Sequence, residues 1–370
     1  MKKVVQFVFS TSVYNIGLQK ALQQSDTFNS KYENISIDIE EVMHDFEHDQ
    51  HFSEYSGLSK ISKLIYWIRM NKYLMSKYAE LKGSIVNIQF VSVFYVMILP
   101  FLKETFDRIV LSFWGSDLLR QSRMILFLLR ALVRRADAIT FETSDMVNAF
   151  RERFGRNYDD RLHIIKFGNY YLDYIDNVTD EDIASFANKY SIDMSKRIVA
   201  VGYNRFFQHR HVEAIRSIRN SGIDKEKLFI IIPWTYGPED SEYKESIESE
   251  LKDYCDHTFI TEHLSNQELA TLRKITDVQI IVQTTDALNG TMLEIMYAGG
   301  EVIIGAWLKY EELYERGIKM HRVENIKDVG KVLGCVLEEP LDEDKRSHNR
   351  GLIKEMFCWK SIAEEWIELY

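Results

Sequence analysis

The stretch IVAVGYNRFFQHRH, residues 198–211, joins a short apolar run to a basic segment across a single glycine. Its first four residues are apolar, as in a buried strand of a parallel sheet. Gly202 then lets the backbone turn and approach a ligand closely. Two arginines and two histidines follow at the start of a predicted helix, where free N–H groups favour an anion. The stretch therefore predicts an α/β domain with a phosphate-binding turn, the alternative being a solvated basic turn.

The same alternation of strand and helix extends on both sides of this stretch. Strands are predicted at Val4–Phe9, Ile35–Val42, Ile85–Phe90, Ile109–Trp114, Ala138–Glu142, Leu162–Phe167, Ile198–Gly202, Leu228–Pro233, Thr258–Thr261, Val278–Val282 and Val302–Ile304. Helical patterns lie between them, and Ser265 with Glu268 forms a capping box that fixes the start of one helix. Such alternation indicates parallel sheets covered by helices.

Length and pattern together predict two domains. A chain of 370 residues suits two α/β domains better than one. We expect a first Rossmann-like domain over residues 1–175, a linker with one helix over 176–195, and a second Rossmann-like domain over 196–350. Residues 351–370 should form a helix that packs back on the first domain. Two doubly wound domains of this kind face a central cleft, where ligands bind at the carboxyl ends of the strands.

The charge is unevenly distributed along the chain. Residues 1–180 are neutral overall, residues 181–370 carry a net charge of −10, and residues 60–135 carry +9. A basic region on an acidic protein indicates an anionic partner, and we expect an anionic membrane face rather than nucleic acid, because no nucleic-acid motif accompanies it. The three cysteines, Cys255, Cys335 and Cys358, form no disulfide framework, which indicates a cytoplasmic protein.

One uncharged run, Gly83–Leu102, is long enough to span a membrane. It contains Asn87, Gln89 and Pro100, which favour a buried strand followed by a core helix. We therefore expect peripheral attachment rather than a membrane-spanning helix. The attachment would use the basic helix Arg120–Arg135 and the basic residues of a second helix.

Two further junctions carry polar residues at strand ends. Residues 286–294 read DALNGTMLE, so that Asp286 precedes a helix and Glu294 lies one turn inside it, where two carboxylates can accept bonds from hydroxyls. Asp117 lies just after a predicted strand and Gly115. It is predicted to act either as a base at the acceptor site or as the cap of the following helix.

Possible metal ligands are sparse. Asp180-Glu-Asp182 and Asp342-Glu-Asp344 lie in acidic stretches typical of solvated charge, and the histidines at 44, 48 and 51 lack a zinc framework. We assign no metal site.

Several segments together resemble a known family. They are FWGSDL at 113–118, residues 138–144, Val201-Gly202 with His211–Ile215, residues 232–236 with Tyr243, residues 264–277, Gly290-Thr291 and Trp359. The chain resembles GT-B-fold glycosyltransferases, and most of all the bacterial 4-acetamido-4,6-dideoxygalactose transferases of enterobacterial common antigen synthesis. Two features depart from that family. The Asp286-x7-Glu294 pair is similar to the acidic pair of the large retaining group, whereas the resembled family is inverting, and Asn204-Arg205 replaces the small residues expected there.

The resemblance implies transfer of a sugar from a nucleotide-diphosphate donor, with no cofactor and no metal. The implied acceptor is a glycan or a polyprenyl-diphosphate-linked glycan at the cytoplasmic face of the inner membrane, and the implied process is surface polysaccharide synthesis. From the residues and the resemblance together, the predicted donor-binding residues are Gly202, Asn204, Arg205, His211, Tyr236, Glu262, Leu264, Asp286, Asn289, Gly290, Thr291 and Glu294. The candidate bases are Asp117, His44 and Asp45. The stereochemical outcome stays open, as do two other functions: a pyruvyl transferase or nucleotide-sugar epimerase on the same scaffold, and a non-catalytic nucleotide-sugar-binding partner.

Overall fold

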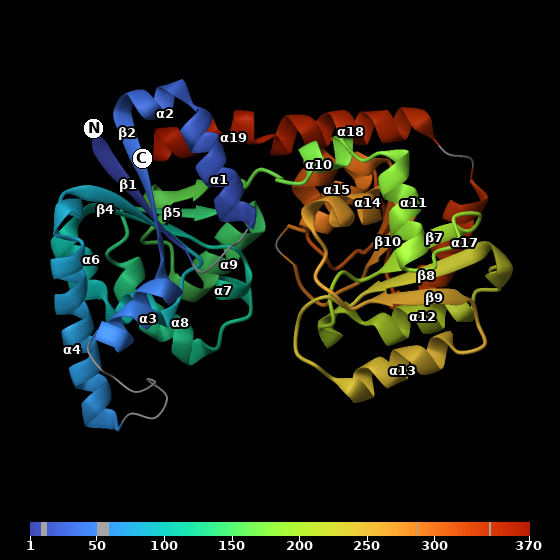
Figure 1. The fold of residues 1–370 in the computed structure, drawn as a ribbon, viewed down its shortest axis with the longest axis horizontal. Coiled ribbons are helices and arrows are strands. Elements are labelled where there is room, and N and C mark those ends of the chain that lie inside the picture. The colour runs from blue at the N-terminus through green and yellow to red at the C-terminus, as the bar shows by residue number, and fades with distance from the viewer. Residues whose placement is uncertain (9–12, 50–58, 287, 340–341) are drawn as a thin grey trace. The chain divides into compact units, whose positions relative to one another are not determined.

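The computed structural model describes residues 1–8, 13–49, 59–286, 288–339 and 342–370, which form two compact units (Figure 1). The first unit comprises Met1–Gly168 and Trp359–Tyr370, and the second comprises Asn169–Cys358. In each unit, helices cover both faces of one sheet (Figure 1).

The first unit contains a six-stranded parallel sheet with strand order β2-β1-β3-β4-β5-β6. Its strands are β1 (Lys2–Val8), β2 (Tyr32–Asp38), β3 (Ser84–Gln89), β4 (Phe106–Ser112), β5 (Ala138–Phe141) and β6 (Leu162–Ile164). Its helices are α1 (Val13–Gln24), α2 (Asp26–Lys31), α3 (Ile39–Asp49), α4 (Lys60–Lys77), α5 (Val93–Met97), α6 (Leu99–Thr105), α7 (Ser116–Leu119), α8 (Arg123–Val133), α9 (Ser144–Phe154) and α19 (Trp359–Leu369), with 3-10 turns η2 (Ala79–Leu81) and η3 (Asp159–Arg161).

The run at 83–102 forms the buried strand β3, as predicted, followed by two short helices, α5 and α6, where a single core helix was predicted. Among the described residues, no helix is both long and apolar enough to cross a membrane. The predicted strand Ile35–Val42 is wrong at its end. Asp38 accepts a hydrogen bond from the backbone N–H of Glu40 at 2.8 Å, and α3 begins at Ile39.

The first unit has polar groups in its core, and α19 satisfies some of them. The buried amides of Gln6 and Asn87 each donate to the Tyr370 hydroxyl at 2.9 Å. Trp366 of α19 is fully buried beside Phe167 and donates its indole N–H to the carbonyl of Lys166. Residues 359–370 are therefore part of the core of the first unit.

The second unit contains another six-stranded parallel sheet, with strand order β12-β11-β10-β7-β8-β9. Its strands are β7 (Arg197–Val201), β8 (Leu228–Pro233), β9 (Asp256–Ile260), β10 (Val278–Ile281), β11 (Glu301–Gly305) and β12 (His321–Val323). Its helices are α10 (Leu172–Asp176), α11 (Asp180–Lys189), α12 (His211–Arg219), α13 (Ser241–Leu251), α14 (Asn266–Ile275), α15 (Gly290–Ala298), α16 (Glu311–Glu315), α17 (Val329–Glu338) and α18 (Glu343–Phe357), with 3-10 turns η4 (Phe207–His209), η5 (Lys225–Lys227) and η6 (Ile326–Asp328).

The stretch expected as a linker, 176–195, lies within the second unit. Phe186 and Ile192 are buried against strand residues Ile198 and Ile231. The Asp180-Glu-Asp182 sequence caps α11, because Asp182 and Thr179 form a capping box. The predicted capping box of Ser265 with Glu268 is confirmed at the start of α14.

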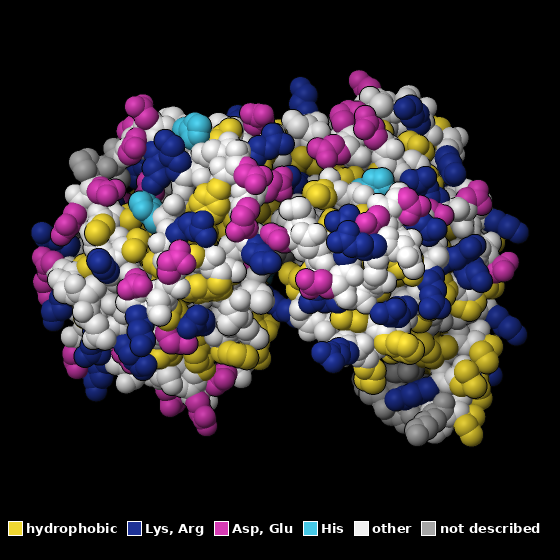
Figure 2. Space-filling model, turned by 180° about the vertical axis from the view of Figure 1, so that it is seen from behind, with side chains coloured by type: hydrophobic (Ala, Val, Ile, Leu, Met, Phe, Trp, Pro, Cys, Tyr) yellow, Lys and Arg dark blue, Asp and Glu magenta, His cyan; other side chains and the backbone are white. Residues whose placement is uncertain are grey.

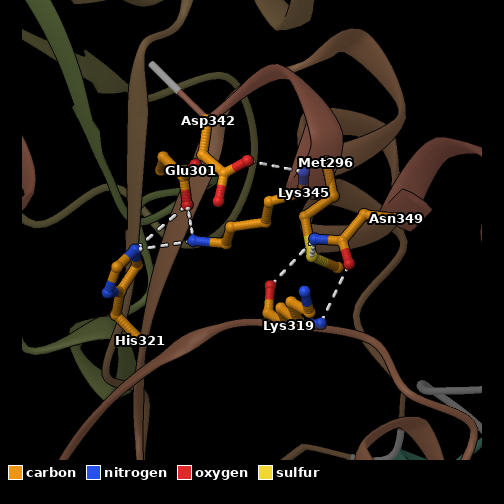
Figure 3. Close-up of polar contacts among 7 residues, drawn as sticks. All are labelled: Met296, Glu301, Lys319, His321, Asp342, Lys345 and Asn349. Carbon is orange, nitrogen blue, oxygen red and sulfur yellow. Dashed lines mark hydrogen bonds and ion pairs between the residues drawn. The ribbon is translucent and has the colours of Figure 1, made fainter. Parts of the chain in front are cut away.

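Helix α18 is attached to the second unit by two polar clusters (Figure 3). Lys345 forms an ion pair with Glu301 at the start of β11, and His321 of β12 lies 3.0 Å from the same carboxylate. Asn349 donates to the carbonyl of Lys319 and accepts from its N–H. Asp342 accepts from the backbone N–H of Lys345 at 2.8 Å, so the second acidic triplet also caps a helix.

Candidate functional site

The order of the second sheet reverses at β7, which has β8 on one side and β10 on the other. Helices α12 and α15 follow β7 and β10, so both begin near this reversal. The Gly202 N–H donates to the carbonyl of Ile280, and the Gln279 side chain donates to the carbonyl of Gly202 at 2.8 Å. In open α/β sheets, ligands bind at the carboxyl ends of the strands at such a reversal.

The turn after β7 requires glycine at position 202. Its φ is +65°, and a Cβ at this position would lie 2.4 Å from Nε2 of His211. The His211 ring is fully buried beneath the turn, with Nδ1 3.0 Å from the Tyr243 hydroxyl. Nε2 has no hydrogen-bond partner within the described part of the chain.

Burial lowers the pKa of His211 to about 3, so the ring is neutral near pH 7. His211 therefore supports the turn from below and adds no positive charge to it, contrary to the expected cationic role. The N–H of His211 itself donates to the Tyr243 hydroxyl at 3.1 Å, so the following N–H groups in the first turn of α12 remain the favourable feature for an anion.

The two arginines of the turn are partly exposed. Arg210, with φ +58°, is the N-cap of α12, and its guanidinium lies 5.5 Å from the Trp307 ring and 3.4 Å from Glu213. Arg205 donates from Nε to the carbonyl of Gly237, and Nη1 lies 3.3 Å from Glu239. Both cations thus lie at the carboxyl edge of the sheet.

The start of α15 is a well-formed cap. The Asn289 side-chain oxygen accepts from the N–H of Met292 at 2.9 Å. Its Nδ2 is buried and, among the described residues, has no partner. Asp286, in the loop before the cap, accepts from the Tyr310 hydroxyl at 2.7 Å. Gly290 and Thr291 follow as the first residues of the helix.

Glu294 is a buried ion-pair partner rather than a surface carboxylate. One oxygen lies 2.8 Å from Nε of Arg273 on α14, and the other accepts from Asn169 at 3.2 Å. Arg273 also donates to the Thr291 hydroxyl at 3.0 Å. Both charged side chains are less than 10% exposed. Sequence analysis missed Arg273 because nothing near it along the chain indicates a carboxylate partner.

Tyr236 is joined to the turn after β7 by two hydrogen bonds, since its carbonyl also accepts from the N–H of Arg205. Its side chain is half-exposed, and its hydroxyl accepts from the buried amide of Asn204 at 3.0 Å. The pKa of Tyr236 is raised overall, and burial is the largest cause. The hydrogen bond from Asn204 and the charge of Arg273 oppose the shift, while the charges of Asp286 and Glu294 add to it.

Two predicted residues lie apart from this arrangement. Glu262 is exposed and accepts from the Tyr190 hydroxyl at 2.7 Å, with Lys189 at 3.1 Å. Leu264 is buried in the hydrophobic core beside α11. Their side chains therefore support the loop after β9.

In the first unit, Asp117 joins two loops. Its carboxylate is fully buried and accepts from the N–H groups of Val91, Trp114 and Gly115 at 2.8, 3.0 and 2.9 Å. Burial raises the pKa of Asp117 to about 6, although these hydrogen bonds oppose the shift. A raised pKa suits a base near neutral pH, but an enclosed carboxylate with three backbone partners acts as a positioning residue.

We expect Asp117→Asn to loosen the loop after β3. The amide oxygen can still accept two N–H groups, but its NH₂ group would face the N–H of Val91, leaving two donors opposed at a cost of about 1–3 kcal/mol. Hydrogen exchange at Val91 should become faster. Asp137→Asn is the matched control, because exposed Asp137 also accepts a backbone N–H, that of Ile109. Equal exchange at Val91 in the variant and the wild type would contradict the positioning role.

His44 and Asp45 lie on α3, away from Asp117 along the chain. His44 is exposed, and Asp45 forms an ion pair with Lys77 at 2.8 Å, which lowers the pKa of Asp45. Asp45 also lines a cavity of about 270 Å³ between β2, α3 and η2. Within the ranges that the structure describes, no group of His, Cys, Asp and Glu is placed to hold a metal, and His51 lies outside them.

No protein-family model and no curated protein matches this chain. Solved structures match over its full length. The Rickettsia africae glycosyltransferase has a TM-score of 0.73 at 12% identity, with 97% of that chain covered. Anabaena HepE in complex with UDP and glucose has a TM-score of 0.72 at 11% identity, with 99% of that chain covered. The trehalose-phosphate synthase of Burkholderia xenovorans in complex with glucose-6-phosphate has a TM-score of 0.68 at 11% identity, with 100% of that chain covered. The chain therefore has the GT-B fold, with two Rossmann-like α/β domains.

Proposed function

We propose that this chain is a glycosyltransferase and that its second unit binds a nucleotide-diphosphate sugar. The observation that carries the proposal is the pair of helix N-termini, α12 and α15, that begin on either side of the sheet reversal at Gly202. One N–H group in each first turn is already bound by a side chain, at His211 and at Met292. The other N–H groups and the helix dipoles favour a diphosphate. Arg205 and Arg210 add positive charge at the same edge.

This arrangement suits the chemistry of glycosyl transfer. The bond between the sugar carbon and the diphosphate oxygen breaks while an acceptor hydroxyl bonds to that carbon, through an oxocarbenium-like state. The nucleoside diphosphate leaves with growing negative charge, and the acceptor proton passes to a base. Preorganised N–H groups and arginines stabilise such a leaving group without a metal. We therefore propose metal-independent transfer, in either stereochemical course.

Similarity of fold supports the donor class. HepE, which shares the fold, was solved with UDP and glucose. We further propose that the acceptor is a glycan or a polyprenyl-diphosphate-linked glycan in bacterial surface polysaccharide synthesis, at the cytoplasmic face of the inner membrane. The resemblance of the 113–118 and 201–215 segments supports this role, as does the net charge of +9 over residues 60–135.

The first test is a thermal-shift panel of UDP, GDP and TDP and their sugars, with and without EDTA. A ligand at 100 times its Kd stabilises the native state by about 2.7 kcal/mol. We expect one nucleotide class to raise the melting temperature, and EDTA to leave that shift unchanged. No shift with any nucleotide would contradict the donor assignment.

Product analysis then separates the four candidate functions. A transferase moves the sugar only when an acceptor is supplied, whereas an epimerase converts the donor alone. A non-catalytic partner binds the donor without turnover, and a pyruvyl transferase leaves the nucleotide sugar unconsumed.

A further inference from the structure

Large apolar side chains are exposed along one face of α4 in the first unit. Ile61, Leu64, Ile65 and Ile68 are 75%, 63%, 44% and 49% exposed. Their spacing of three and four residues places them on a single helical stripe. The opposite face of α4 is buried through Tyr66, Trp67, Met70 and Leu74. The helix is thus attached to the unit by one apolar face while it presents a second apolar face outward.

Helix α8 has the same character. Leu126, Leu129, Leu132 and Val133 are buried, as the ordinary interpretation of a sheet-covering helix requires. Met124 and Phe127 are nevertheless 71% and 69% exposed, and Leu128 is 41% exposed. Packing on the sheet therefore leaves a substantial part of the apolar surface of α8 uncovered.

Helix α5 lies between these two helices. The Phe94 ring packs edge-on against Trp67 of α4 at 5.8 Å, the carbonyl of Met97 accepts from Asn71 at 3.0 Å, and α5 is also in contact with α8. Met97 itself is 36% exposed. We call the exposed side chains of the three helices the apolar surface; they are Ile61, Leu64, Ile65, Ile68, Met97, Met124, Phe127 and Leu128.

Basic groups accompany the apolar surface. Arg123 and Arg134 are exposed and lie four residues before and seven residues after Phe127, on the same side of α8. Exposed Lys72 follows Ile68 by four residues on α4. Neither helix contains an acidic residue. Figure 2 shows hydrophobic and basic side chains together at the lower right, over the end of the first unit that holds α4.

We propose that the apolar surface docks onto a bilayer of anionic lipid, with its apolar side chains in the acyl boundary and its basic groups at the headgroups. Interfacial helices combine an apolar face with flanking Lys and Arg in this way. Nucleic acid would leave the apolar side chains without a partner. A second copy would place basic helices against each other, which like-charge repulsion opposes. The inference rests on the membrane placement in the proposed function and is independent of the transfer reaction.

The test is sedimentation with phosphatidylglycerol vesicles and with phosphatidylcholine vesicles, at low and high salt. The wild type should bind the anionic vesicles and lose most of that binding at high salt. Leu64→Gln combined with Phe127→Gln should reduce binding by about tenfold or more, since each residue loses its burial in the acyl boundary. Arg123→Ala and Arg134→Ala should each reduce it by about fivefold.

Met194→Gln is the matched control, because Met194 is an exposed apolar residue of the second unit, 44% accessible. It should bind like the wild type. All variants should keep the wild-type melting temperature and nucleotide shift, which separates loss of docking from loss of donor binding. Equal binding to both lipids, no binding to either, or wild-type binding by the Leu64→Gln/Phe127→Gln variant would overturn the proposal. A dimer in gel filtration that this variant dissociates would assign the surface to a second copy instead.

Discussion

Arg273→Met should lower the free energy of unfolding of the second unit by about 3–5 kcal/mol, because it leaves the carboxylate of Glu294 buried without its cation. The pair is enclosed, with exposures of 6% and 7%, and Arg273 also holds the Thr291 hydroxyl at the start of α15. Glu294→Gln should be destabilising for the same reason, since it leaves the guanidinium without a charged partner. Urea denaturation of each variant measures the loss.

A double-mutant cycle distinguishes the pair from its separate parts. Arg273→Met with Glu294→Met should cost less than the sum of the single changes, because no buried charge is left. Arg216→Met is the control, since Arg216 also forms a short ion pair, at 2.6 Å from Glu250, but is 57% exposed. It should cost at most about 1 kcal/mol. Similar losses for Arg216→Met and Arg273→Met would contradict the central role of the buried pair.

Gly202→Ala should weaken nucleotide binding by more than tenfold. The new Cβ would lie 2.4 Å from Nε2 of His211, in a backbone conformation that side chains rarely adopt. His211 cannot move aside without leaving the Tyr243 hydroxyl, so the turn itself has to shift. A shift there displaces the N–H groups at the start of α12. Calorimetric titration with the nucleotide selected by the thermal-shift panel gives the change in Kd.

Gly222→Ala provides the matched control for backbone strain. Gly222 also has a positive φ, +78°, but its added Cβ would meet nothing within 4 Å. It should lose about 1–3 kcal/mol of stability without losing nucleotide affinity. Adding His211→Ala to Gly202→Ala should restore part of the affinity by removing the clash. Wild-type affinity in Gly202→Ala would show that the nucleotide does not use this turn.

The fold was predictable because its strands are continuous apolar runs separated by helical periodicity. The strands β7, β8 and β10 illustrate this, since each is buried on both faces and consists almost entirely of Val, Ile, Ala and similar residues. Strand β12 was missed because its three residues, His321–Val323, contain a single buried apolar side chain. Its register comes from pairing with β11, which no local pattern reveals.

The candidate site was predictable as a place but not as a set of roles. The position of Gly202 at a strand end, and of Asn289 at a helix cap, follows from local sequence. Whether a polar side chain is exposed or enclosed depends on residues far away along the chain. The partner of Glu294 lies on α14, and the three N–H groups around Asp117 come from two separate loops. The sequence patterns therefore predicted ligand-binding roles for Glu294 and Asp117, whereas both side chains are buried and hold other parts of the protein in place.

The division of the chain also sets an order of events during synthesis. The second unit is one continuous stretch, Asn169–Cys358, whereas the first unit needs Trp359–Tyr370 to complete its core. On the ribosome, the whole of the second unit emerges before those residues do. Until then, the amides of Gln6 and Asn87 lack the Tyr370 hydroxyl that they bind in the finished protein. The core of the first unit therefore stays incomplete while the continuous second unit can fold. The unit that is synthesised first is the one that is finished last.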